Sequence, residues 1–519
     1  MRSIEFESED FAHLRVIGGL ESLLNRNLLA HFPESLLLEL MPDACDAIVV
    51  GSGPNGLAAA ITLARAGCSV VVYEANATIG GGARSAELTL PGFVHDVCSA
   101  VHPLAAGSPF FKTLPLDRFG LEWIQPEIPL AHPLDDGFAA CLYKDLDFTA
   151  EQLGRDSRAY RRLMQPLAHN WEQLAIEFLQ PMLHWPQHPI TLTRFGVPAI
   201  CPATLLARFL FRHAPARALF AGIAAHSFLP LEAPVSSAFA LVLGLAGHAV
   251  GWPIPRSGSQ QISRALAGYL QELGGSIELN RRIENFNELP KSRAILLDVS
   301  VWEFLRIAGR QLPPGYRQRL EKFRHAPGIF KIDYALSSPI PWKAKACRQA
   351  GTIHLGGDID EIAATEREVA RGKIPTRPFV LVAQQSVFDE TRAPHGRHTL
   401  WAYCHAPFNC GMDMSDQIES QIERFAPGFR DCILARHKTC AADLATSNSN
   451  LSGGDISGGA ANLMQLLARP ILSTTPYRTP LPGVYLCSAS TPPGGGVHGM
   501  CGYHAACVAL RDHFSTRKR

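Results

Sequence analysis

Three glycines follow a short apolar run in the segment AIVVGSGPNG, residues 47–56. The run at 46–50 is nearly all apolar, as expected for a strand that is covered on both faces. Residues 57–67 are rich in alanine and leucine with helical spacing, and they end at a glycine that suits a helix C-terminus. A second β-branched run, 69–75, has Glu74 near its end. This order of strand, glycine loop, helix, strand and acid predicts a βαβ unit that binds a dinucleotide.

The parts of this unit have separate physical functions. Gly51 permits the tight turn, Gly53 lets the backbone approach a pyrophosphate, and Gly56 lets the helix and strand pack closely. The start of the helix offers free N–H groups and the positive end of its dipole to the phosphates. Glu74 can accept hydrogen bonds from ribose hydroxyls, and its charge would repel a 2′-phosphate. The remaining predicted cofactor contacts of this unit are Pro54, Asn55 and Ala75.

A second glycine loop follows the acid. Residues 75–88 read ANATIGGGARSAEL. Glycines followed by an arginine just after the ribose acid are typical of flavoproteins of the amine-oxidase and phytoene-desaturase type, and they favour FAD over NAD. The predicted cofactor contacts of this loop are Gly81, Gly82, Ala83 and Arg84, with Arg84 as a charge partner of the pyrophosphate.

The segment 481–514 supplies a second strand, glycine loop and helix. The sequence ends at residue 519, before a further strand and ribose acid could follow, so we do not expect a second nucleotide fold here. Instead, we expect this helix start to face the cofactor held by the first loop, where its dipole can stabilise negative charge on the reduced ring. The predicted cofactor contacts of the segment are Ser490, Gly495, Gly496, Val497 and His498.

Seven stretches of the sequence match, in the same order, the pattern of one protein family: 49–60, 79–96, 247–266, 329–342, 351–357, 453–470 and 481–499. By these stretches the chain, from about residue 44 to residue 511, resembles the phytoene dehydrogenase-related FAD-dependent oxidoreductases. The resemblance implies an α/β fold with a Rossmann-like FAD-binding domain of the amine-oxidase and phytoene-desaturase type, interleaved with an α+β substrate domain. It also implies that the loop after the ribose acid passes the pyrophosphate and the flavin.

The same resemblance gives the expected domain organisation. A helical N-terminal extension is predicted over residues 1–43. The FAD-binding domain is predicted to consist of residues 44–125, 251–310 and 451–519, and the substrate domain of residues 126–250 and 311–450. The two domains are therefore expected to interleave within one body.

A segment without charged residues, 233–252, is long enough to cross a bilayer. Its proline, serines and glycines dilute the apolar character, which favours a buried helix that lines an apolar cavity. The aromatic stretches 378–383 and 400–408 are further candidates for the cavity wall. Such a cavity indicates a lipophilic substrate of polyene, fatty or terpenoid type, and the predicted substrate contacts are Trp252 and His405.

The chemistry is expected to come from the flavin, and the protein supplies an apolar slot and shielding from water. The predicted activity is hydride transfer from a C–H bond of the substrate to the flavin, with desaturation or oxidation of a carbon skeleton. His498 is the predicted acid or base because its loop is expected to face the flavin. Two alternatives stay open at this point: redox-neutral isomerisation or saturation on the same scaffold, and a flavin-binding protein without turnover.

Composition excludes several other classes. The 48 lysines and arginines balance 47 aspartates and glutamates, so there is no basic excess for nucleic-acid binding. The thirteen cysteines form no CxxC pair, and Cys68 and Cys98 are too distant in sequence to be a disulphide-exchange pair. We expect reduced thiols in a cytoplasmic protein and no metal site. Residues 13–40 read as amphipathic helices that pack on the body or, alternatively, contact a membrane surface or a second subunit.

Overall fold

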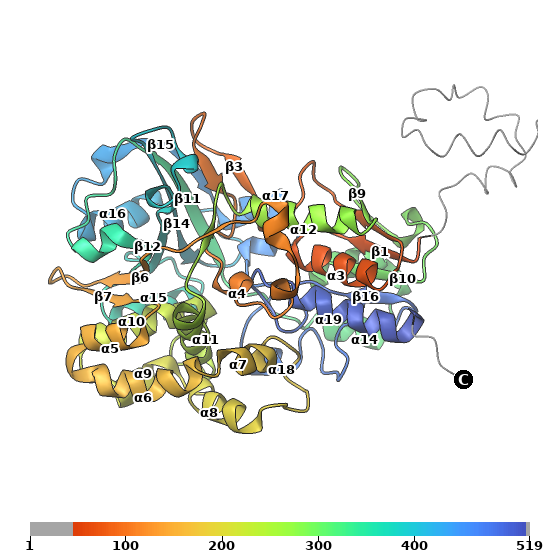
Figure 1. The fold of residues 1–519 in the computed structure, drawn as a ribbon, viewed down its shortest axis with the longest axis horizontal. Helices are drawn as coiled ribbons and strands as arrows, with labels where there is room; N and C mark the ends of the chain where they lie inside the picture. The colour runs from red at the N-terminus through yellow and green to blue at the C-terminus, as the bar shows by residue number, and fades with distance from the viewer. Residues whose placement is uncertain (1–44, 515–519) are drawn as a thin grey trace, which may run out of the picture. The chain divides into compact units, whose positions relative to one another are not determined.

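One spatial half of the fold is built on a parallel five-stranded sheet. The computed structural model describes residues 45–514 (Figure 1), and the predicted helical extension at 1–43 lies outside these residues. The strands in spatial order are β16 (Val484–Leu486), β10 (Ala294–Leu297), β1 (Ala47–Val50), β2 (Val70–Tyr73) and β9 (Ser276–Glu278). Since β1 pairs with both β10 and β2, the predicted βαβ unit lies at the centre of this sheet.

The central strand is apolar at every position because both faces of the sheet are covered. Successive side chains of β1 point to opposite faces: Ala47 and Val49 to one core cluster, Ile48 and Val50 to another. The first face is covered by three helices, α3 (Pro54–Arg65), α12 (Gln260–Glu272) and α19 (Met500–Ala509). The second face is covered by α13 (Val301–Ala308) and α14 (Pro314–Leu320).

The second half contains a mixed seven-stranded sheet. Its strands in spatial order are β15 (Ile433–Thr439), β11 (Gly328–Leu336), β14 (His398–Ala406), β13 (Val380–Ala383), β12 (Ala350–Leu355), β6 (Ile128–Pro133) and β7 (Ala139–Leu142). On one face Phe330 and Ile332 pack with α16 (Ser415–Phe425). On the other face Leu381, Trp401 and Tyr403 belong to the cluster that includes the helical layer of this half.

The helical layer follows β7 in the chain and forms the lower part of the molecule in Figure 1. Its main helices are α6 (Ser157–Ala168), α7 (Trp171–Phe178), α8 (Pro189–Ala199), α9 (Ala203–Leu210), α10 (Ala214–Ala224) and α11 (Ser236–Ala249). The predicted buried helix in the charge-free segment is α11, where Leu241, Leu245 and Ala246 are almost fully buried. Within residues 45–514 no helix taken singly has the length and apolar character to cross a bilayer.

The two sheets draw their strands from alternating parts of the chain. The five-stranded sheet takes β1 and β2, then β9 and β10, and finally β16. The seven-stranded sheet takes β6 and β7, and then β11 to β15. As a result, the chain passes repeatedly from one half to the other, and the space between the halves is lined by segments that are distant in the sequence.

Candidate functional site

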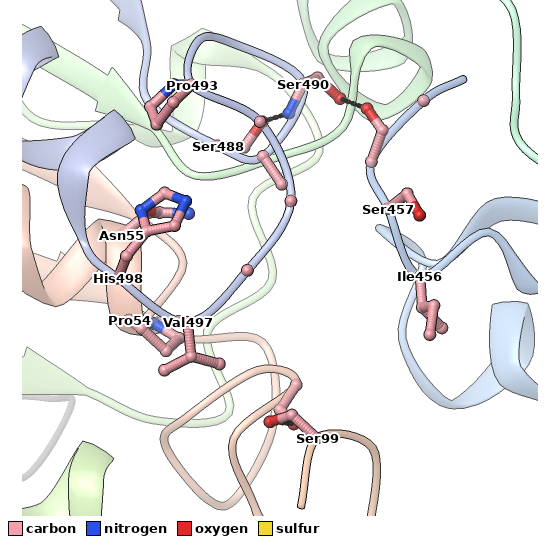
Figure 2. A pocket seen from close by; sticks show the side chains of 18 of the residues that line it. Pro54, Asn55, Ser99, Ile456, Ser457, Ser488, Ser490, Pro493, Val497 and His498 are labelled. Atoms are coloured by element: carbon pink, nitrogen blue, oxygen red, sulfur yellow. Dashed lines mark hydrogen bonds between the residues drawn. The ribbon is translucent and has the colours of Figure 1, made fainter. Parts of the chain in front are cut away.

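A cavity of about 890 Å³ connects the glycine loops of the five-stranded sheet with the helical layer. Figure 2 shows Val497 and His498 of the C-terminal loop beside Pro54 and Asn55 of the first glycine loop, with Ser457 on another wall. The predicted cofactor contacts that line this cavity are Gly51, Gly53, Pro54, Asn55, Glu74, Ala75, Gly81, Gly82, Ala83, Ser490, Gly495, Gly496, Val497 and His498. The two distant glycine segments therefore face one common space.

The first glycine loop has the close packing that the motif requires. A Cβ built at Gly56 would lie 2.0 Å from the carbonyl oxygen of Gly51, so this position places α3 tightly against the turn. Gly51 has φ +102°, which an L side chain rarely adopts. Gly56 itself does not line the cavity, and its function here is helix packing.

Glu74 lies at the carboxyl end of β2, where it is only 5% exposed. Its Oε2 accepts hydrogen bonds from the backbone N–H and the hydroxyl of Ser52, at 2.9 and 2.6 Å. Its Oε1 accepts from the backbone and the side chain of Asn76, both at 2.9 Å. These four bonds hold the carboxylate at the edge of the cavity, in the position expected for a ribose acceptor.

The second glycine loop lies directly on the first. The N–H of Gly80 donates to the carbonyl oxygen of Ser52 at 3.0 Å, and a Cβ at Gly81 would lie 3.2 Å from the Cα of Gly53. Arg84 does not face the cavity; its Nε donates to the carbonyl oxygen of Gly81 at 2.9 Å. The structure thus corrects the expectation for Arg84, which shapes the loop instead of pairing with a pyrophosphate.

The C-terminal loop joins the first loop through a close helix crossing. A Cβ at Gly502 of α19 would lie 1.8 Å from the carbonyl oxygen of Asn55 in α3, so only glycine permits this approach. At the start of α19, a Cβ at Gly499 would lie 3.0 Å from the Cβ of Ala58. The first turns of the two helices are therefore in contact, as the sequence led us to expect for the two ends of the chain.

His498 lines the cavity but uses its ring within its own loop. Its Nδ1 accepts the N–H of Met500, in the first turn of α19, at 3.0 Å. Burial lowers the pKa of His498 to about 4, against the raising effect of hydrogen bonds with the carbonyl groups of Gly494 and Gly495. The neutral ring therefore caps a helix and braces the loop, and this leaves no free ring nitrogen for the acid or base role that the sequence suggested.

Asp298 is a site residue that sequence reasoning missed. It follows β10, and its Oδ2 accepts the N–H of Gly56 at 2.9 Å. A Cβ at Gly53 would lie 2.6 Å from the same oxygen, so a glycine is needed here for the acid as well as for any phosphate. Burial, followed by the negative charge of Glu74, raises the pKa of Asp298 to about 7.

A buried arginine was also missed. Arg469 lines the cavity at 2% exposure, and its guanidinium donates to the carbonyl oxygens of Ser457, Gly458 and Ala489 at 2.8 to 3.0 Å. Burial is the main cause that lowers the pKa of Arg469. These hydrogen bonds connect the segment around residue 457 with the loop after β16. No local sequence pattern predicts such a long-range contact.

Beyond the glycine loops the cavity continues into a region that we call the apolar arm. Its walls come from α7, α8, α11, β13, β14 and nearby loops. The lining side chains of the apolar arm are Phe178, Leu179, Leu192, Phe195, Phe228, Phe239, Val242, Leu243, Trp252, Leu381, Trp401 and Tyr403. This agrees with the prediction that the charge-free segment and two aromatic stretches form the wall of an apolar cavity.

The two predicted substrate contacts have different positions. Trp252 lines the arm, and its Nε1 donates to the carbonyl oxygen of Leu243 at 3.1 Å. His405 does not line the cavity; it lies behind Phe228, with ring centroids 4.0 Å apart, and its Nδ1 is 2.8 Å from Oε2 of Glu366. The structure corrects the expectation for His405, which is buried and hydrogen-bonded with Glu366. The described residues 45–514 contain no cluster of metal-ligating side chains.

The residues fit an FAD molecule. The cavity has an acid for the ribose at one end, two stacked glycine loops and a helix start in the middle, and an apolar region at the other. The buried Oδ1 of Asn55, in the first turn of α3 and on the cavity wall, has no protein partner. An unpaired buried acceptor of this kind requires a ligand or water as its partner.

Comparison with known proteins gives consistent results. Residues 49–112 match the family model described as an NAD(P)-binding Rossmann-like domain. Pyridine nucleotide-disulfide oxidoreductase domain-containing protein 2 of Rattus norvegicus is 25% identical over 90% of this chain and 93% of its own length. Hydroxyneurosporene desaturase of Cereibacter sphaeroides is 30% identical over 44% of this chain and 48% of its own. A putrescine oxidase variant of known structure has a TM-score of 0.60 at 17% identity, over 90% of this chain and 99% of the other.

These comparisons confirm several of the predictions. The fold is that of the amine oxidases, and the predicted resemblance to desaturase-type FAD oxidoreductases is confirmed. The prediction of an FAD-type oxidoreductase is confirmed with it. The matched family model covers residues 49–112, which hold the first βαβ unit and the second glycine loop, and a βαβ unit of this kind does not by itself separate FAD from NAD.

Proposed function

We propose that this protein oxidises or desaturates a lipophilic substrate that enters the apolar arm. The single observation that supports the proposal is the lining of this arm, in which apolar and aromatic side chains from both halves enclose the space beyond the glycine loops. FAD, when bound, supplies the acceptor for a hydride from a substrate C–H bond. The protein residues supply the binding energy, the orientation of the substrate and the exclusion of water.

The arm does not suit a diamine. A cationic substrate needs a free carboxylate, and among the described residues the only acid that lines the apolar end is Glu177. Its Oε2 is 2.6 Å from Nε2 of His184, and its Oε1 accepts the N–H of His188 at 2.7 Å. This carboxylate is only 1% exposed and is already bonded to protein groups, so the arm offers an ammonium group little compensation for its lost hydration. We therefore do not propose for this protein the amine substrate that the name of the structural neighbour gives.

Loss of a hydride from a C–H bond leaves a proton to be removed in a desaturation. His226 lines the arm, and its Nε2 lies 3.0 Å from Nε2 of His354, so the pair holds one ring proton between them. Burial lowers the pKa of His226 to about 3. His226 is therefore a neutral, weakly basic group at the apolar end, where it can contact a substrate, and the base role predicted for His498 is not transferred to it.

Anaerobic spectroscopy tests the proposed function. The purified protein is loaded with FAD, and candidate polyene, fatty or terpenoid compounds are added in detergent micelles while the absorbance of oxidised flavin is followed. The proposal expects bleaching by a lipophilic compound and none by putrescine. Product formation without net flavin reduction would instead indicate a redox-neutral isomerase. Photoreduction without a response to any lipophilic compound, including one extracted from the purified protein, would contradict the proposal.

A further inference from the structure

An exposed apolar surface lies over the apolar arm. We call it the α8–α9 surface, and it comprises the loop before α8 and the outer faces of α8 and α9, at the lower edge of Figure 1. Ile190 and Val197 are two turns apart on α8, whereas Leu205 and Phe209 are one turn apart on α9. The exposed fractions are 92% for Trp185, 71% for Ile190, 65% for Val197, 61% for Leu205 and 83% for Phe209. Single exposed apolar side chains are ordinary, but a group on consecutive elements indicates an interaction surface.

The cavity opens at this surface. Met182 and Ile200 line the cavity and are also 51% and 52% exposed. On α8, Leu192 and Phe195 face the cavity while the opposite side of the helix is exposed. A single helix thus separates the apolar arm from the apolar exterior, and a path between them begins beside it.

The charge of this region favours a membrane over another protein. Residues 178–231 contain no aspartate or glutamate, and their arginines are Arg194, Arg208, Arg212 and Arg217. Exposed Arg194 and Arg212 form no ion pair with any described residue. Exposed apolar side chains flanked by arginines, with a tryptophan among them, match the headgroup region of an anionic bilayer. Two copies of this surface would instead bring like charges together.

We propose that the α8–α9 surface docks this protein on an anionic lipid bilayer, so that a lipophilic substrate passes from the acyl chains into the apolar arm. The α8–α9 pair has the length and composition of a span only when taken together, and it is bent by 98° between the two helices. It therefore lies in the interface and does not cross the bilayer. The docking itself is independent of the proposed function. The identity of the molecule that enters the arm as a lipophilic substrate rests on the proposed function.

Vesicle sedimentation of the full-length, FAD-loaded protein tests the docking. The vesicles contain phosphatidylcholine alone or with phosphatidylglycerol. We expect binding to the anionic vesicles that weakens with salt, and a loss of at least about tenfold in the triple variant Trp185→Ser, Ile190→Ser, Phe209→Ser. The matched control replaces exposed apolar residues of the other half, Met412→Ser and Leu434→Ser, which are 60% and 46% exposed. The control should bind as the unchanged protein does.

The outcomes separate docking from catalysis. Flavin reduction by micellar substrate should be unchanged in the triple variant, because none of its three residues lines the cavity. Absence of vesicle binding, or equal binding by the triple variant, would overturn the proposal and leave the proposed function intact. A stable dimer that the triple variant dissociates, without vesicle binding by either protein, would also overturn it and assign the surface to a second copy of the chain.

Discussion

The carboxylate of Asp298 and the backbone N–H of Gly56 form a hydrogen bond of 2.9 Å at the start of α3. A buried acid therefore occupies part of the helix end that a dinucleotide motif offers to a pyrophosphate. Burial and the charge of Glu74 raise the pKa of Asp298 to about 7, so the acid changes charge near physiological pH. Its protonation state is thus expected to affect how the site accepts an anionic cofactor.

We expect the affinity for FAD to fall as pH rises through about 7. The protonated carboxyl of Asp298 is neutral, whereas its carboxylate repels a diphosphate; a bound diphosphate in turn raises the pKa further, so binding takes up a proton. Fluorescence titration of the apoprotein should show the dissociation constant for FAD increasing about tenfold between about pH 6 and pH 8.5. The Asp298→Asn variant keeps an acceptor for Gly56 and should lack this increase.

The apoprotein provides an independent check of the same group. Between about pH 4 and pH 7 the unfolded chain releases the proton of residue 298 while the folded protein retains it, so this group lowers stability as pH rises. In this window the unfolding free energy of Asp298→Asn, measured with denaturant, should fall less with pH, or rise more steeply, than that of the unchanged protein, because buried histidines with lowered pKa values act in the opposite direction. If Asp298→Asn and the unchanged protein had the same pH profile of FAD affinity and the same pH profile of stability, the titration of Asp298 would not have the role assigned to it.

The Gly53→Ala variant should lose FAD affinity. A Cβ at residue 53 would lie 2.6 Å from Oδ2 of Asp298, which forces the acid or the loop to move. We expect a loss in unfolding free energy of about 1–3 kcal/mol and at least about a tenfold loss of FAD affinity. Gly315→Ala is the control, because a Cβ at that position meets no atom within 4 Å. In the Asp298→Ala background the stability loss caused by Gly53→Ala should be smaller, and equal losses would refute the contact.

The sequence predicts the nucleotide half of the site well because its signals are local. The turn at Gly51, the loop at Gly81 and the acid at Glu74 all lie within one continuous segment, where strand, loop and helix periodicities fix their mutual positions. Asp298 follows β10, which pairs with β1, and the carboxyl ends of parallel strands meet at one edge; the apolar run 294–297 before this acid is the signal that could have indicated it.

Other features depend on long-range contacts that one sequence does not reveal. Arg469 reaches carbonyl groups on two separate loops, and only the folded backbone brings these together. His405 was expected to face the substrate because its strand is aromatic. It does share a face of β14 with Trp401 and Tyr403, but the ring of Phe228 covers it and separates it from the cavity. The side chain of Arg84 folds onto its own loop, where its Nε donates to the carbonyl oxygen of Gly81.

Two substitutions at His498 should differ from each other. In His498→Asn the amide oxygen can still accept the N–H of Met500, so FAD retention should be close to that of the unchanged protein. In His498→Ala the first turn of α19 loses its acceptor, and we expect the free energy of unfolding to fall by about 1 kcal/mol. With saturating FAD, both variants should retain flavin reduction by substrate within about tenfold, because general acid or base catalysts contribute about 100-fold or more. A larger loss in both would restore the acid or base role of His498.

The Val242→Phe variant should block the apolar arm without disturbing the nucleotide end. Val242 lies on α11 and lines the arm, so a phenyl ring there takes up space that a substrate needs. We expect FAD affinity and dithionite reduction to be unchanged, and flavin reduction by a long lipophilic compound to slow by at least about tenfold, with a smaller effect on a short one. Stopped-flow absorbance under anaerobic conditions measures all three rates. Equal slowing with dithionite would indicate a damaged flavin site, and unchanged rates with every compound would show that the substrate does not enter this arm.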